Sequence, residues 1–371
     1  MKFTVNSNEL QRMLNKISGV IPSKSTLPIL ENFLLTLSKN SLHAIATDLE
    51  ISMSATVDVR GTEEGSLAVP ARRVMDTIRA LPDTQIVFIG DQASNKVKMV
   101  TESGEYNLVG EASKDFPATP EFKAENEIPM DGGLLAGLIN RTIFSVSTDE
   151  LRPAMTGVLL QLREKEVVAV ATDGHRLVRV NYAGIGVAKS GKDIIIPAKA
   201  LVLVAKMIED DTCTVSVSGT HVRFSFKNVT LTSRLIGENY PNYETVIPLD
   251  NEKRLTVNRH TLLAGVRRVS LYSNSATHQI RFSMRKNELK LAAEDVDFGG
   301  EAKERINCIY DAEDLEIGFN AHYVVDILGH IESDDVVFKF SSAVRAAIVT
   351  PAVEKENEDV LMLVMPMRLN T

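Results

Sequence analysis

Apolar residues recur along this chain in three similar blocks, each a short run rich in β-branched residues followed by a helical pattern. The blocks occupy residues 67–81, 194–208 and 316–331. Between the run and the helix stands a residue that favours a helix start, which is Pro70, Pro197 or Asn320. These starts lie 127 and 123 residues apart. A repeat of that length is the size of a whole domain, so the pattern predicts three homologous domains in succession.

The first unit shows the plan of the repeat. The i, i+3, i+4, i+7 spacing of an amphipathic helix is kept by Leu10, Met13, Leu14 and Ile17. Alternation of apolar and polar residues, typical of antiparallel hairpins, occurs at 32–37, 41–46 and 51–57. We therefore predict an α+β fold in which each domain has two helices and antiparallel sheets. Proline-containing loops separate the units, which gives predicted domains at 1–122, 128–247 and 253–371.

The composition is that of a soluble globular protein. Of 371 residues, 44% are hydrophobic and 24% are charged, which excludes intrinsic disorder. No apolar run reaches the roughly 20 residues that cross a bilayer, and the first ten residues contain no signal-peptide core. We therefore expect a cytoplasmic protein without membrane contact. Cys213 and Cys308 lie far apart and lack metal-ligand spacing, so we predict reduced thiols and neither a metal nor a cofactor.

Charge is divided unevenly between the predicted helices and the remainder of the chain. The net charge of −8, taken alone, argues against a nucleic-acid partner. The predicted helices (7–18, 70–80, 132–145, 197–208, 258–270 and 321–331) nevertheless contain three acidic residues and eleven basic ones, which are Arg12, Lys16, Arg72, Arg73, Arg79, Arg141, Lys199, Lys206, Arg259, Arg267 and Arg268. A basic face on one helix is usually only solvated. The same sign on five helices of three units favours contact with phosphates.

The sequence contains none of the common catalytic motifs. A phosphate-binding loop, an HExxH pair and a Gly-x-Ser-x-Gly elbow are all missing. Acidic residues follow a predicted strand in every unit, at Asp48, Asp173 and Asp295, and this recurrence favours a turn-forming role. One alternative stays open, an α+β hydrolase-type enzyme with a site near Asp173 and His175. Another is a three-domain scaffold that never meets DNA.

Two segments break the repeat, Ala171-Thr-Asp-Gly-His-Arg-Leu177 and Leu363-Val-Met-Pro-Met-Arg-Leu369. Together with Met1-Lys-Phe-Thr-Val5, Val69-Pro-Ala-Arg72 and Ile317-Gly-Phe-Asn320, they make the whole chain resemble the bacterial sliding clamps, the beta subunits of DNA polymerase III. The resemblance implies the DNA clamp fold and a non-catalytic, head-to-tail homodimeric ring that encircles double-stranded DNA without sequence preference. The implied partners are the alpha subunit of DNA polymerase III, the clamp loader, and other polymerases and repair proteins that carry clamp-binding motifs.

The resemblance also implies a docking groove between the second and third domains for short motifs containing Gln and Leu or Phe. The matching positions are Met155, Thr172, Gly174, His175, Arg176, Leu177, Pro241, Val246, Asn320, Tyr323, Val344, Leu363, Val364, Met365, Pro366, Met367 and Arg368. Methionine side chains make adaptable apolar surfaces, which suits such a role. For DNA contact the resemblance points to Lys24 and Arg72. The charge on the helices adds Arg73, Arg79, Arg141, Lys199, Lys206, Arg267 and Arg268.

Helix packing sets the size of such a ring. With two helices per unit about 10 Å apart, one chain would enclose a bore of roughly 9 Å and two chains a bore of roughly 28 Å. A duplex about 20 Å across passes only through the second. Head-to-tail closure needs unlike surfaces on the first and third units. Our candidates for these surfaces are Tyr106 on one side and Leu271 with Tyr272 on the other.

Overall fold

The structure is a computed structural model that describes residues 1–371 except 185–191, 210–211 and 370–371. The α-helices of the described residues are α1 (Ser7–Ser18), α2 (Ala71–Ala80), α3 (Gly132–Thr142), α4 (Ala198–Ala205), α5 (Arg259–Ser270) and α6 (Ala321–Gly329). All six predicted helices are confirmed. Three of them begin directly after the predicted start residues Pro70, Pro197 and Asn320. Asn320 caps α6, because its side chain accepts a hydrogen bond from the backbone N–H of His322.

The strands form four antiparallel sheets. From one edge to the other, the first sheet consists of β5 (Arg60–Glu63), β1 (Lys2–Asn6), β7 (Gln85–Asp91), β8 (Lys96–Val100) and β9 (Glu105–Val109). The second consists, in the same sense, of β10 (Glu111–Ala112), β6 (Gly65–Pro70), β2 (Asn32–Ser38), β3 (Ser41–Thr47), β4 (Ile51–Asp58), β18 (Val229–Arg234), β17 (His221–Ser225), β16 (Cys213–Val217) and β11 (Asn126–Met130). These two sheets belong to a first compact unit, residues 1–136 and 199–235.

The other two sheets belong to a second compact unit, residues 137–198 and 236–371. The third sheet is β15 (Asp193–Pro197), β12 (Gly157–Leu162), β13 (Glu166–Thr172), β14 (Arg176–Ala183), β27 (Glu358–Val364), β26 (Ala347–Pro351), β25 (Asp335–Phe340), β19 (Lys253–Asn258) and β23 (Ile309–Tyr310). The fourth is β22 (Gly300–Asn307), β21 (Glu288–Asp295), β20 (Gln279–Arg285) and β24 (Leu315–Asn320). Each sheet therefore lies within one compact unit, and each of the two nine-stranded sheets combines strands from two successive sequence repeats.

Each repeat supplies two blocks of four strands. The blocks β6-β2-β3-β4, β15-β12-β13-β14 and β24-β20-β21-β22 correspond, as do β1-β7-β8-β9, β11-β16-β17-β18 and β19-β25-β26-β27. A block of the first kind pairs with a block of the second kind from the next repeat, β4 with β18 and β14 with β27. We call these pairings the first and second joints. The strands in the corresponding place that remain at a sheet edge are β9 and β22.

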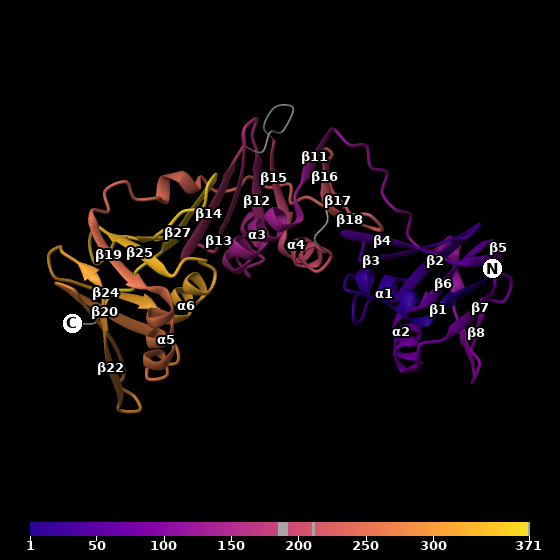
Figure 1. The fold of residues 1–371 in the computed structure, drawn as a ribbon, viewed down its shortest axis with the longest axis horizontal. Coiled ribbons are helices and arrows are strands. Elements are labelled where there is room, and N and C mark those ends of the chain that lie inside the picture. Colours follow the sequence, from indigo (N-terminus) through magenta and orange to yellow (C-terminus); the bar gives the residue numbers. More distant parts are fainter. Residues whose placement is uncertain (185–191, 210–211, 370–371) are drawn as a thin grey trace. The chain divides into compact units, whose positions relative to one another are not determined.

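The helices cover the sheets with the apolar faces that the sequence predicted. In the first unit, α1 packs against α2 and β4 and buries Leu10, Met13, Leu14 and Ile17. In the second unit, α5 and α6 lie side by side against the strands (Figure 1). Within the described part of the chain, no helix is long and apolar enough to span a membrane. Cys213 and Cys308 are free thiols.

Candidate peptide-binding groove

A cavity of about 730 Å³ opens on the second unit, and we call it the groove. Its size falls within the usual range for ligand sites. It is lined by the turn between β13 and β14, by the chain that follows Tyr240, by the turn between β25 and β26, and by the end of β27. Eleven of the predicted groove residues line it, namely Met155, Thr172, Gly174, His175, Arg176, Leu177, Pro241, Val246, Val344, Leu363 and Met365.

The groove has an apolar floor and an apolar rim. Leu177, Leu363 and Tyr243 belong to one buried hydrophobic cluster. At the rim, Leu249 and Val344 stay exposed to solvent. Exposed apolar side chains around a buried apolar floor are typical of a surface that receives a partner's hydrophobic anchor.

The turn that forms one wall of the groove is fixed by its own aspartate. Asp173 Oδ1 accepts hydrogen bonds from the backbone N–H groups of His175 (2.8 Å) and Arg176 (2.9 Å). Asp48 makes the same bonds in the first repeat. The recurring aspartate is therefore a turn former, as the sequence predicted. Gly174 has φ +89°, and a Cβ there would lie 3.1 Å from the Arg152 guanidinium and 3.8 Å from the terminal methyl of Met155.

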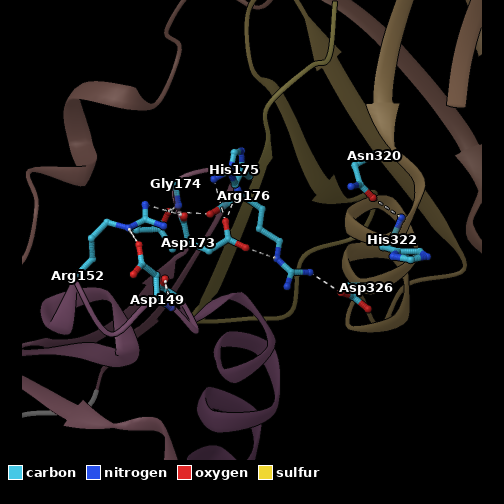
Figure 2. A network of polar contacts seen from close by, with 11 residues as sticks. Asp149, Arg152, Asp173, Gly174, His175, Arg176, Asn320, His322 and Asp326 are labelled. Atoms are coloured by element: carbon cyan, nitrogen blue, oxygen red, sulfur yellow. Dashed lines mark hydrogen bonds and ion pairs between the residues drawn. The ribbon is translucent and has the colours of Figure 1, made fainter. Parts of the chain in front are cut away.

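Arg176 joins this wall to α6, as Figure 2 shows. Its Nε donates to Asp173 Oδ2 (3.0 Å), and its Nη1 donates to Asp326. The guanidinium also lies 4.8 Å from the ring centroid of Tyr323. His175 stacks on the same ring at 5.8 Å. Tyr323 therefore supports the groove wall from behind without lining the cavity.

The remaining predicted groove residues do not line the cavity. Val364 was expected in the groove, but alternation along β27 places it on the opposite face from Leu363, where it is fully buried. Asn320 caps α6 instead. In the chain end, the backbone N–H of Met367 donates to Gly318, and the carbonyl of Arg368 accepts from Gln279. Pro366, between Met365 and Met367 in sequence, is not among the residues that line the cavity.

Sequence reasoning missed nine lining residues, which are Asn242, Tyr243, Thr245, Ile247, Pro248, Leu249, Asp250, Arg345 and Ala346. Seven of them follow Pro241 in the connection between the second and third repeats. The resemblance named only Pro241 and Val246 in that segment. The run of apolar residues at 246–249, unusual for an exposed connection, was the signal that could have found the others.

Most of the predicted DNA-contacting side chains are exposed. Lys24, Arg73, Lys206 and Arg267 stand in solvent. Four others are exposed and form an ion pair with a carboxylate. Arg72 and Arg79 both pair with Asp76, Lys199 pairs with Asp48, and Arg268 pairs with Glu304.

Arg141 does not fit the prediction of DNA contact. Its side chain is only 6% exposed. Nη1 donates to Glu358 (2.5 Å) and to the hydroxyl of Tyr182 (2.7 Å), and Nη2 donates to Glu332 (2.8 Å). Burial raises the pKa of Tyr182 to about 12, so this hydroxyl stays neutral. Arg141 therefore fastens α3 to the third repeat, and we remove it from the residues predicted to contact DNA.

The candidates for the subunit interface lie at the two open sheet edges. Tyr106 is a half-buried residue of β9. Leu271 and Tyr272 follow the end of α5, and Leu271 is 81% exposed. Tyr272 lies beside β22, since a Cβ on Gly300 would be 3.6 Å from its ring. Among the described residues, no group of three or more His, Cys, Asp or Glu side chains could hold a metal ion.

Comparison with known proteins gives a consistent result over the whole chain. Models of the DNA polymerase III beta subunit match in succession, with the N-terminal domain at residues 1–120, the central domain at 130–242 and the C-terminal domain at 244–368. The beta sliding clamps of Chlamydia muridarum and Vibrio cholerae are 31% and 29% identical over 375 residues, with 100% of each chain covered. The crystal structure of a sliding clamp from Bartonella birtlesii bound to griselimycin superposes with a TM-score of 0.95 at 31% identity, covering 100% of both chains.

Proposed function

Because this chain belongs to the family of DNA polymerase III beta subunits, the bacterial sliding clamps, we propose that two copies close into a ring around duplex DNA. Family membership makes the chain a processivity factor for DNA polymerase and not an enzyme. The hydrolase alternative at Asp173 and His175 has no support, because Asp173 is engaged in its turn. We keep 1–122, 128–247 and 253–371 as the proposed limits of the three domains.

One observation carries the proposal of a ring, the pair of unpaired edges β9 and β22. The chain makes the same joint twice, β4 with β18 and β14 with β27. The third joint of this kind would need β22 and β9, which lie in different compact units. Pairing β22 of one copy with β9 of the next satisfies both edges by strand addition, and the contact is head-to-tail.

The two existing joints also set the register of the third. They pair Ser233 with Ile51 and Val364 with Arg176. The hairpin of β17 and β18 is closed by a hydrogen bond from the backbone N–H of Leu235 to the carbonyl of Thr220, and Ser233 lies two residues before Leu235. In the first repeat, the hairpin of β8 and β9 is closed by the backbone N–H of Gly110 and the carbonyl of Asn95, and Leu108 lies two residues before Gly110. Leu108 is therefore the counterpart of Ser233.

On the other edge, Gly300 is the counterpart of Ile51. Thr47 and Glu294 are equivalent, because each directly precedes the recurring aspartate, Asp48 or Asp295. Thr47 pairs with Ser52 in the first repeat, and Glu294 pairs with Glu301 in the third. The residue before Ser52 is Ile51, and the residue before Glu301 is Gly300.

We therefore propose that Leu108 of one copy faces Gly300 of the next across the seam. In an antiparallel pair this register sets Tyr106 opposite Ala302 and Glu105 opposite Lys303, which brings opposite charges together. Tyr272 lies beside Gly300 in its own chain, so the two predicted tyrosines would meet.

We propose that the exposed basic residues Lys24, Arg72, Arg73, Arg79, Lys199, Lys206, Arg267 and Arg268 face the DNA. Contacts of this kind carry no sequence information, which suits a protein that must slide. The groove is proposed to hold the clamp-binding motifs of the alpha subunit of DNA polymerase III, the clamp loader, other polymerases and repair proteins. The protein would act in the cytoplasm.

The test of the ring is retention on a nicked circular plasmid after loading by the cognate loader. A ring held by topology stays on the circle at salt concentrations that remove phosphate contacts, which weaken by about 10³ to 10⁵ between 50 and 200 mM salt for proteins making 6 to 10 such contacts. One restriction cut should then release the protein. Departure from circular and linear DNA at equal rates would mean that electrostatics holds it.

A further inference from the structure

We propose that Asp326 is a positioning residue for the groove. It holds Arg176, and through Arg176 the turn at 172–177, in the conformation that accepts a partner peptide. Asp326 does not line the cavity, and its side chain is 42% exposed on α6. The inference rests on the proposed function of the groove as a peptide site. We call the ion pair between Arg176 and Asp326 the latch.

The latch is the ionic contact that ties the groove wall to a distant element. Asp173 belongs to the same turn as Arg176, whereas Asp326 lies 150 residues further along the chain. The Arg176 side chain is only 11% exposed. It is held between two aromatic faces, 4.8 Å from the ring centroid of Tyr323 and 5.3 Å from that of Phe144. Figure 2 shows the guanidinium reaching from the turn to α6.

Aromatic contacts continue on both sides of the latch. The Phe144 ring stacks on His330 at 4.1 Å, and His330 Nδ1 lies 2.7 Å from the backbone oxygen of Asp326. On the groove side, His175 stacks on Tyr323. A change at Asp326 is therefore transmitted to groove-lining residues through packed side chains.

The first joint contains an ion pair of the same kind with its sign reversed. There the turn supplies the acid, Asp48, and helix α4 supplies the base, Lys199. An ion pair between the turn and a helix is thus present at both joints, although the positive charge lies on the helix in the first joint and on the turn in the second. At the second joint the turn it holds is a groove wall, so the same contact there sets the shape of the peptide site.

Replacing Asp326 by Asn removes the charge at nearly constant size. Arg176 then keeps Asp173 and both aromatic rings, so the fold survives. The turn loses its ion pair to α6 and is left there with the contacts to the ring of Tyr323. If only a fraction of the molecules holds the turn at 172–177 in the conformation that accepts the peptide, the apparent dissociation constant for the peptide rises by the inverse of that fraction. The association rate falls with it. The dissociation rate stays unchanged, because Asp326 does not touch the peptide.

The experiment uses the full chain and a fluorescein-labelled nonapeptide containing a glutamine and a Leu-Phe pair. Anisotropy gives the dissociation constant, and stopped flow gives the two rates. For Asp326→Asn we expect an association rate about three- to tenfold lower, a dissociation rate within about twofold, and a melting temperature within about 2 °C. Asp326→Glu should recover much of the loss. The matched control is Asp314→Asn, which breaks the exposed pair with Arg285 in the fourth sheet.

A double-mutant cycle separates positioning from general loosening. Once Arg176→Ala has removed the latch, adding Asp326→Asn should change the dissociation constant by less than about twofold. A full further loss in the double variant, a rise in the dissociation rate alone, or a large fall in melting temperature would each overturn the proposal. So would an unchanged association rate in Asp326→Asn. Failure of the wild type to bind the peptide would instead overturn the groove assignment itself, and the latch with it.

Discussion

Replacing Arg141 should destabilise the second unit strongly and leave DNA retention unchanged. In Arg141→Met the carboxylate of Glu358, whose side chain is 9% exposed, loses its cation in a buried site. Breaking a buried ion pair in this way costs about 3 to 5 kcal/mol. For a unit of about 200 residues, each kcal/mol lowers the melting temperature by about 2 to 4 °C. The expected fall is therefore about 6 to 20 °C.

Two variants make the result specific to burial. Replacing both partners, Arg141→Met with Glu358→Met, should recover most of the loss, because apolar residues of similar volume commonly match or exceed a buried ion pair. Arg152→Met breaks the exposed pair with Asp149 and should leave the melting temperature within about 1 °C of wild type. Calorimetry of the four proteins measures these shifts. A melting temperature that does not change in Arg141→Met, together with weaker retention on DNA, would return Arg141 to the residues predicted to contact DNA and refute the reasoning.

Three further predictions concern the seam, the groove and the response to acid. Leu271→Ala with Tyr272→Ala should convert the dimer to monomer at micromolar concentration, and an unchanged mass by light scattering would place the seam elsewhere. Met365→Ala should weaken a groove peptide about tenfold or more in an anisotropy titration, as loss of a central anchor does, and full-strength binding would exclude Met365 as an anchor. The hydrogen bond from Lys355 lowers the pKa of Glu332, so its contribution to stability is complete above about pH 4.5 and is lost as the pH falls through the lowered pKa. Melting curves of Glu332→Gln should therefore fall less steeply with acid than those of wild type, and parallel curves would contradict this.

The substitution at Met365 is preferable to deletion of the chain end. The backbone N–H of Met365 donates to the carbonyl of His175 at 2.8 Å, and that of Met367 donates to Gly318 at 2.8 Å. Removing residues 365–371 would therefore free the groove wall and the edge of β24 together. A loss of peptide binding in such a deletion could not be assigned to the methionine side chain, whereas Met365→Ala keeps both backbone hydrogen bonds.

Local patterns predicted the helices and turns well because they depend on neighbouring residues. The buried face of α1 follows from spacing alone, and the turn at Asp173 follows from a side chain that bonds its own backbone. Arg141 shows where this reasoning fails. Its partners Glu332 and Glu358 lie 191 and 217 residues away, so nothing near it in sequence reveals that it is buried. Counting charges on helices recorded its sign but not its surroundings.

The groove shows the same division between local and distant information. His175 and Leu177 could be identified because their segment departs from the other repeats. Most of the residues that follow Pro241 were missed, since they line the groove only because the connection packs beside the ends of β14 and β27. That position depends on pairing between β14 and β27, strands that lie about 180 residues apart in sequence.

The repeat explains why the two joints of one chain differ in use. Leu49 and Gly174, at the same place in the two turns, have similar positive φ angles of +81° and +89°, although a leucine rarely adopts such a φ. The aspartate of each turn, Asp48 or Asp173, holds this conformation through the same two backbone hydrogen bonds, so the residue that follows it is free to vary. In the first repeat the position carries a leucine side chain. In the second repeat it carries only a hydrogen, and the space beside Met155 belongs to the groove. The proposed peptide site thus lies where the second repeat departs from the others, whereas the features that the repeats share build the proposed ring.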